Sequence, residues 1–314
     1  MALVNDVARA TEPSLASRDL REGGRWSTAQ RVKNDVLFVL VTVALAVARR
    51  LPTGLLRALG RGLGLLAWAV VPGARRTAMQ NVARAMPEMD ARARGPFVRR
   101  VYRELGALLG ETVASLDRRR SLPPLPFLPG ARECLEAAIA EGRGVVFASA
   151  HLGPWERVAS SLVAAGIPLT VVAREPYDPR LASIYDALRS RRGVRTIYRG
   201  ATGAGIALVR VLRRGHVLGV PMDLASRVES VDVPFLGSPA PTPVGPARLA
   251  LRTGAAVVVG TAARAPDGTL GIAFERIEPS SSERELTARI NAELSRRIRA
   301  MPEAWVWMHR RWPG

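Results

Sequence analysis

The chain has 314 residues, of which 48% are hydrophobic, so it can bury a substantial core and is not a disordered chain. Its formal net charge of +19 predicts a polyanionic partner, but aromatic residues make up only 5% and no basic-aromatic stacking motif occurs. This composition argues against nucleic acid and leaves an anionic membrane face, a phosphorylated lipid or an acidic protein. The single cysteine, Cys134, excludes a disulfide framework, and with only three dispersed histidines we predict no metal site.

The N-terminal part begins with a polar stretch and continues with two apolar segments. Residues 1–30 have no clear period and predict a flexible tail, without the features of a signal peptide. The run 36–48 is apolar except for Thr42, but a membrane-spanning helix needs about 20 residues. A second apolar segment, 63–71, contains Trp68 and follows two arginines. The pair predicts interfacial helices on an anionic membrane, and a buried pair of core helices is the alternative.

Two further helices and a linker follow. The patterns predict helices over 75–87 and 92–116, and a proline-rich linker over 122–129. We therefore expect a helical, membrane-associated region over 31–121 and an α/β domain over 122–314.

Beyond the linker, helical and strand patterns alternate. Strands are predicted at 145–148, 169–173, 195–198, 217–220, 256–262 and 270–274. Helices are predicted at 131–141, 156–165, 179–191, 203–213, 246–253 and 283–301. This alternation predicts an α/β fold with a central sheet flanked by helices, and the hairpin of the last two strands makes the sheet mixed. Residues 239–245 are predicted to form a rigid loop beside the functional site.

The candidate site begins where the first of these strands ends. His151 follows the strand 145–148, Gly153 lies in the turn, and Glu156 stands five residues after the histidine. A histidine is a suitable general base near neutral pH, and a nearby carboxylate can orient it and stabilise the imidazolium. Backbone N–H groups near Gly153, or an arginine, are candidates to stabilise an oxyanion. No protein nucleophile lies close by, so the base is expected to act on a substrate hydroxyl. A purely structural histidine is the alternative.

Two more candidates lie at strand ends. Arg174 follows the strand 169–173, where open α/β sheets place their ligands, and its guanidinium is suited to grip a phosphate. Asp223 follows the strand 217–220 and is expected to fix Arg174 or a substrate hydroxyl. A solvated loop arginine and a turn carboxylate are the alternatives.

The C-terminal segment combines tryptophans with arginines. Trp305, Trp307 and Trp312 accompany Arg310 and its neighbour Arg311. This composition is typical of a membrane-interface patch and equally of a packed C-terminus, and we expect packing together with headgroup contact by Arg310.

Four blocks carry a specific resemblance. They are His151-Leu-Gly-Pro-Trp-Glu156, Arg174 in Val-Ala-Arg-Glu-Pro-Tyr-Asp-Pro, Asp223 after the strand 217–220, and Met301-Pro-Glu-Ala-Trp-Val-Trp-Met-His-Arg-Arg-Trp312. In this order they resemble the late acyltransferases of lipid A biosynthesis, the bacterial lauroyl/myristoyl family within the lysophospholipid acyltransferase superfamily. Two further stretches are similar to the family as well: Asn81-Val-Ala-Arg-Ala-Met-Pro-Glu88, and Val233-Pro-Phe-Leu-Gly237 followed by Thr242-Pro-Val-Gly245. The resemblance covers residues 35–312. Pro154 and Leu224 depart from the family pattern, which often has asparagine and glutamine or histidine there.

The resemblance implies a glycerol-3-phosphate acyltransferase-like α/β fold and a membrane-associated enzyme on the cytoplasmic face of the inner membrane. It implies transfer of a fatty acyl chain from acyl carrier protein or acyl-CoA to a hydroxyl of a lipid A precursor, with no other cofactor. His151 is then the general base, oriented by Glu156. Acyl carrier proteins are acidic, so the net positive charge suits such a donor as well as anionic lipid.

Other functions stay open at this point. Some relatives of this family acylate phosphatidylinositol mannosides, so a different phospholipid acceptor is the first alternative. A non-catalytic basic membrane-binding protein is the second, and it would not depend on His151. A thioesterase, with water in place of the acceptor, is the third, although no nucleophile motif supports it.

Overall fold

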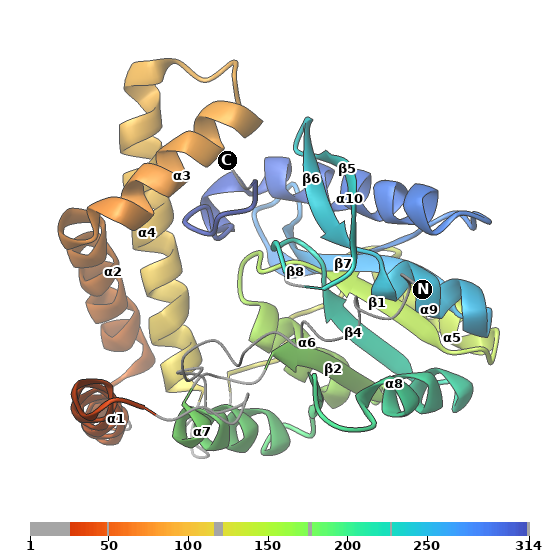
Figure 1. Cartoon of the computed structure of the whole chain (residues 1–314), viewed down its shortest axis with the longest axis horizontal. Helices are drawn as coiled ribbons and strands as arrows, with labels where there is room; N and C mark the ends of the chain where they lie inside the picture. The colour runs from red at the N-terminus through yellow and green to blue at the C-terminus, as the bar shows by residue number, and fades with distance from the viewer. Residues whose placement is uncertain (1–25, 49, 116–121, 175–177, 227, 313–314) are drawn as a thin grey trace, which may run out of the picture.

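The computed structural model describes residues 26–48, 50–115, 122–174, 178–226 and 228–312 (Figure 1). Most of the predicted tail, 1–30, lies outside these residues.

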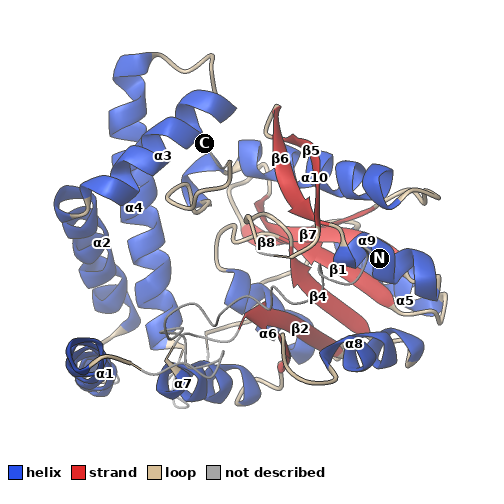
Figure 2. Ribbon diagram, in the orientation of Figure 1, coloured by secondary structure: helices blue, strands red, loops and turns tan. Residues whose placement is uncertain are grey.

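A six-stranded sheet forms the centre of the α/β part (Figure 2). Its strands are β1 (Val145–Ser149), β2 (Leu169–Arg174), β3 (Arg195–Arg199), β4 (Val217–Pro221), β7 (Ala256–Arg264) and β8 (Leu270–Arg276). They lie in the order β3-β2-β4-β1-β7-β8, in which all neighbours are parallel except the antiparallel pair β7 and β8. The predicted mixed sheet flanked by helices is confirmed. Because the five parallel strands run in one direction, their carboxyl ends share one edge of the sheet.

Helices cover both faces of this sheet. One face packs against α5 (Ala131–Ala140) and α6 (Trp155–Ala164), and the other against α8 (Ala204–Arg213), α9 (Gly245–Thr253) and α10 (Glu283–Ala300). Alternate residues of β1 pack on opposite faces of the sheet. Phe147 packs on the face covered by α5 and α6, whereas Val146 and Ala148 pack on the other face. Both faces are therefore buried, as expected for a parallel sheet.

One element differs from prediction. The segment expected as a rigid loop, 239–245, contains most of strand β6 (Ser238–Pro243), which pairs with β5 (Ser230–Phe235) in a separate two-stranded sheet. The strand was not predicted because every second residue is a proline, which lacks the N–H needed for hydrogen bonds between strands. In an antiparallel pair only alternate residues exchange hydrogen bonds, so alternating prolines are compatible with one strand of a hairpin.

Four helices precede the α/β part. They are α1 (Thr28–Ala48), α2 (Thr53–Val70), α3 (Pro72–Ala85) and α4 (Ala91–Ala114), and they stand beside the sheet, at the left in Figure 1. Among the described residues, no single helix is long and apolar enough to cross a bilayer; α2 and α3 meet that test only together, and they are bent by 92°. The boundary between a region 31–121 and a domain 122–314 stays a prediction.

Helices α2 and α4 pack with their backbones in close approach. A Cβ atom added to Gly60 or Gly106 would lie 2.1 Å from the carbonyl oxygen of the other residue, so only glycine fits at this crossing. The outer side of α2 carries the exposed apolar residues Leu55, Leu59, Leu63, Leu66 and Val70, and α1 carries Val32, Val36, Leu37, Val39, Leu40, Val43 and Val47. The alternative of a buried pair of core helices is therefore wrong for these side chains.

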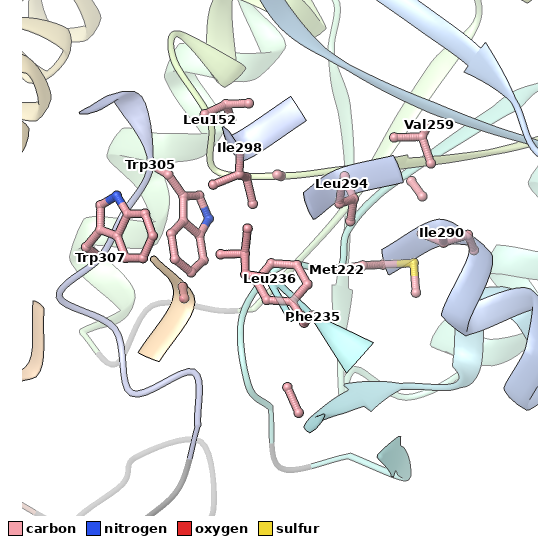
Figure 3. Packing of buried hydrophobic residues seen from close by; sticks show 14 of the residues in the cluster. Leu152, Met222, Phe235, Leu236, Val259, Ile290, Leu294, Ile298, Trp305 and Trp307 are labelled. Atoms are coloured by element: carbon pink, nitrogen blue, oxygen red, sulfur yellow. The ribbon is translucent and has the colours of Figure 1, made fainter. Parts of the chain in front are cut away.

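The C-terminal segment packs between the helices and the sheet. Trp305 and Trp307 are fully buried with Phe235 and Leu236 (Figure 3), and Trp312 is 6% exposed. The buried amide of Asn81, on α3, donates hydrogen bonds to the carbonyl oxygens of residues 307 and 309, at 2.8 and 2.7 Å. A membrane-interface patch made of these tryptophans is excluded, and the prediction of a packed C-terminus is confirmed.

Candidate active site

The catalytic histidine candidate stands at the carboxyl edge of the sheet. His151 follows β1, and β4 pairs with β1 so that Pro221 lies opposite Ser149. The N–H of Met222 then donates to the carbonyl oxygen of Ser149 at 2.9 Å. This pairing extends β4 just far enough to place Asp223 beside His151, although the two residues are 72 positions apart.

Asp223 is fully buried and accepts three hydrogen bonds. Its Oδ1 lies 3.0 Å from His151 Nδ1, and its Oδ2 accepts from the His151 backbone N–H at 2.9 Å and from the indole of Trp305 at 2.8 Å. A carboxylate at Nδ1 keeps the proton of the neutral ring on that nitrogen and leaves Nε2 free to act as a base. The ring is 27% exposed, so a substrate can reach it.

The surrounding charges set the protonation of this pair. Burial disfavours the charged imidazole, but Asp223, with a smaller contribution from Glu156, outweighs burial and raises the pKa of His151 above its ordinary value. Burial would likewise raise the pKa of Asp223, but His151 and Trp305 hold it below its usual range. The carboxylate is therefore ionised and is placed to stabilise an imidazolium at His151.

The carboxylate that contacts the His151 ring is Asp223, and not Glu156 as the sequence had predicted. Glu156 binds the guanidinium of Arg189 with both oxygens, at 2.5 and 3.1 Å, and reaches His151 through its charge alone. Glu156 lies in the first turn of helix α6, which begins at Trp155. Its carboxylate there contacts Arg189, on helix α7 (Pro179–Ser190), instead of His151. The proposed role of Asp223 in fixing Arg174 is also corrected, because its bonds go to His151 and Trp305.

The backbone N–H of Gly153 is not free for an oxyanion. It donates to the carbonyl oxygen of Ala304 at 3.0 Å, beside the bridge that joins Leu152 to Trp305. Gly153 has a φ of 61°, and an added Cβ would lie 3.2 Å from Ala262, so the residue is needed for the turn. The N–H of Gly153 is therefore excluded as an oxyanion donor, and an arginine stays a candidate.

Two cavities meet at His151. A narrow cavity of about 60 Å³ lies on the α6 face, and a wide one of about 720 Å³ lies on the side of α8 and α9. Both are lined by His151, Arg189, Val172 and Pro221. Arg189 therefore lines both cavities together with His151. The sequence did not predict this residue, because Arg189 lies inside a helix pattern and belongs to no motif.

The narrow cavity is mostly apolar. It is lined by Phe147, Val158, Ala159 and Val171, and by two strand glycines, Gly219 and Gly260. A Cβ at Gly260 would meet the rings of Phe274 and Phe147 at 2.3 and 2.7 Å, so that position is filled by aromatic side chains. At Gly219 the nearest atoms would lie at 3.3 to 3.5 Å. This lining suits hydrocarbon rather than a polar group.

The wide cavity is lined by cations and tyrosines as well as apolar groups. Arg174 lines it together with His151, so these two predicted residues share one cavity. Arg310 is exposed and lines neither cavity, and its contact with a headgroup stays a prediction. His309 lines the wide cavity, and burial lowers its pKa, so it is a neutral ring beside the site.

The chain is similar to known acyltransferases. Residues 25–313 match the model of a family described as bacterial lipid A biosynthesis acyltransferase. Two phosphatidylinositol mannoside acyltransferases of Mycobacterium tuberculosis, from strains CDC 1551 / Oshkosh and ATCC 25618 / H37Rv, are 28% identical to the chain over 183 residues. The match covers 57% of this chain and 58% of each relative, less than two thirds of their length.

Proposed function

Because the chain belongs to the bacterial lipid A biosynthesis acyltransferase family, we propose that it moves a fatty acyl chain from a thioester to a hydroxyl of a phosphorylated glycolipid. The observation that carries this proposal is the meeting of two unlike cavities at one histidine. The apolar cavity suits the acyl chain, and the wide cavity with its arginines suits an anionic headgroup. His151, between them, is accessible to both reactants.

The geometry supports a direct transfer. His151 Nε2 takes the proton from the acceptor hydroxyl while the oxygen attacks the thioester carbonyl carbon. Asp223 holds the ring and offsets the imidazolium charge, and Arg189 stabilises the oxyanion. The intermediate collapses by breaking the carbon–sulfur bond, and His151 returns the proton to the leaving thiolate. No covalent acyl-enzyme is needed, because His151 acts on the acceptor itself.

The acceptor and donor follow from the family and the relatives. A lipid A precursor is our first candidate for the acceptor, because the family is described by lipid A biosynthesis. A phosphatidylinositol mannoside is the second, because the named relatives act on that lipid. The donor is acyl carrier protein or acyl-CoA. Both acceptors combine sugar hydroxyls with phosphate, which the wide cavity is suited to bind.

The test is an acyl-transfer assay with purified protein in detergent–lipid mixtures. Labelled acyl carrier protein and acyl-CoA are each offered with a lipid A precursor, with a phosphatidylinositol mannoside and without acceptor. We expect an acylated product with one acceptor, identified by mass spectrometry. Thioester loss without product in every mixture would instead indicate a thioesterase, and no turnover of either donor would indicate a membrane-binding protein.

The apolar cavity makes the acyl-chain preference testable at Gly219. An alanine Cβ would touch Leu169, Val171 and Phe147 at 3.3 to 3.5 Å, so Gly219→Ala should fold and narrow the cavity. We expect the kcat/KM ratio of a 16-carbon over a 12-carbon donor to fall by about tenfold, since a mismatch of one methylene costs about 1–3 kcal/mol. The measurement is a competition between the two donors. An unchanged ratio in a folded variant would place the acyl chain elsewhere.

We assign the exposed apolar residues of α1 and α2 to a membrane surface, at the cytoplasmic face of the inner membrane. The glycine crossing holds one side of α2 against α4, so its leucines on the outer side remain uncovered. A contiguous apolar stripe of this kind is typical of an interfacial helix. Arg57 and Arg61 lie on the same helix and suit anionic headgroups.

Glutamates on the outer side of α2 should release the protein from lipid. Leu59 and Leu63 are 48% and 58% exposed, so the double variant Leu59→Glu/Leu63→Glu should fold but bind vesicles at least about tenfold more weakly. The measurement is flotation with vesicles of phosphatidylglycerol and phosphatidylethanolamine. Ile206→Glu, on α8, is the control, because Ile206 is 68% exposed but far from this surface in sequence and fold. Equal flotation of both variants would contradict the assignment.

A further inference from the structure

The arginines of the wide cavity differ in how their charges are balanced. Arg189 is paired with Glu156. Arg248 binds two carboxylates, Glu229 and Glu283, and these pairs raise its pKa. These guanidiniums therefore have protein partners already. Two other arginines line the same cavity and differ from them.

Arg174 and Arg199 are next to each other and have no carboxylate partner in the part of the chain that the structure describes. They end the neighbouring strands β2 and β3 and stand opposite each other in the parallel register. Among the described residues, neither forms an ion pair, and Arg199 donates a hydrogen bond to the hydroxyl of Ser226. Burial and the charge of Arg174 lower the pKa of Arg199, as expected for a cation whose neighbour is a second cation.

We propose that Arg174 and Arg199 together clamp a phosphate group of the acceptor's headgroup, an inference that rests on the proposed function. The backbones of Arg174 and Arg199 lie about one strand spacing apart in the register, so both guanidiniums can reach the oxygens of one phosphate. The bound anion supplies a negative charge that none of the described residues pairs with these two arginines.

The sheet order indicates acceptor phosphate rather than donor phosphate. Strand β4 separates β2 from β1, so Arg174 and His151 follow strands two spacings apart, roughly 10 Å. A sugar phosphate bridges that span when one of its hydroxyls reaches His151. In acyl carrier protein and in acyl-CoA, by contrast, the whole extended pantetheine arm separates the phosphate from the thioester.

The first test measures binding without catalysis. Calorimetry would compare glucosamine 1-phosphate and inositol 1-phosphate with glucosamine, inositol, inorganic phosphate and coenzyme A as ligands of the whole chain. We expect the sugar phosphates to bind wild type at least about tenfold more tightly than the uncharged sugars, and Arg174→Gln and Arg199→Gln each to lose about tenfold of that affinity. Arg195→Gln is the matched control, because Arg195 begins the same strand β3 at its opposite end.

The second test is kinetic. Each variant should raise KM for the acceptor about tenfold and leave KM for the acyl donor unchanged, and Arg→Lys variants should recover part of the loss. Thermal melting checks that the variants fold. Sugar phosphate binding that persists in both Gln variants overturns the clamp. So does coenzyme A whose binding depends on the pair.

The two proposals fail in different ways. If acyl transfer is absent but the sugar phosphates bind through both arginines, the proposed function fails and the phosphate site remains. If acyl transfer occurs and neither arginine affects acceptor KM, the proposed function stands and the clamp is wrong.

Discussion

Replacement of His151 by asparagine is expected to lower the rate of acyl transfer by about 10²–10⁴-fold, the usual contribution of a general base. The asparagine amide nitrogen can take the place of Nδ1 and donate to Asp223, so the buried carboxylate keeps its partners and the fold is preserved. What the variant lacks is Nε2, which is the atom that accepts the proton from the acceptor hydroxyl. The measurement is kcat with saturating donor and acceptor.

The control for this variant is His216→Asn. His216 stands just before β4, at the amino edge of the sheet, and lines neither cavity at the active site. Its replacement should leave kcat within about threefold of wild type, because it contacts no reactant. Vesicle flotation should be equal for wild type and both variants. A His151→Asn protein with wild-type kcat would show that another group removes the proton, and the assignment of the base would be abandoned.

The sequence predicted the sheet well because its signals are local. Each strand is a short apolar run between helical patterns, and the observed bounds differ from the predicted ones by a residue or two. The hairpin of β5 and β6 was not predicted, because prolines are usually excluded from strands. Strand β6 tolerates its prolines because it belongs to a separate two-stranded sheet and not to the central one.

The active site could be predicted only in part. The sequence predicted His151 and its position at the end of a strand, but it did not predict which carboxylate contacts the histidine ring. The nearest carboxylate in sequence was Glu156, whereas the nearest in space is Asp223, because β4 inserts between β2 and β1. That insertion depends on the packing of the whole sheet, and no spacing within one segment encodes it. The contribution of Trp305 depends in the same way on the packing of the C-terminal segment.

Replacement of Asp223 by asparagine is expected to lower kcat by roughly 10³–10⁴-fold, as for the buried aspartate of a serine protease triad. The carbonyl oxygen of the new amide must accept from Trp305 and from the His151 backbone N–H, as Oδ2 does now. Its NH₂ group then faces His151 Nδ1 and donates to it. The neutral ring is forced to carry its proton on Nε2, and a protonated Nε2 cannot act as a base.

The pH dependence provides a second readout that separates Asp223 from Glu156. The base works only when His151 is neutral, so kcat/KM falls as pH drops through the pKa of the free enzyme's histidine. In wild type this decline should lie above the ordinary value for histidine, because Asp223 raises that pKa despite burial. Asp223→Asn removes the negative charge that raises the pKa of His151, so burial then lowers this pKa. The midpoint of the kcat/KM decline should therefore move to lower pH, in addition to the loss of rate.

Glu156→Gln is the matched comparison, since it also neutralises one carboxylate near the ring. Glu156 raises the pKa of His151 less than Asp223 does, and its direct bonds go to Arg189. We therefore expect a smaller midpoint shift in the same direction and a loss of kcat below about tenfold, through a less firmly held Arg189. A larger loss and a larger shift in Glu156→Gln than in Asp223→Asn would return the orienting role to Glu156. A larger loss and a larger shift in Asp223→Asn would establish that the carboxylate that orients His151 is Asp223, which follows the neighbouring strand β4, and not Glu156 on the helix after the histidine.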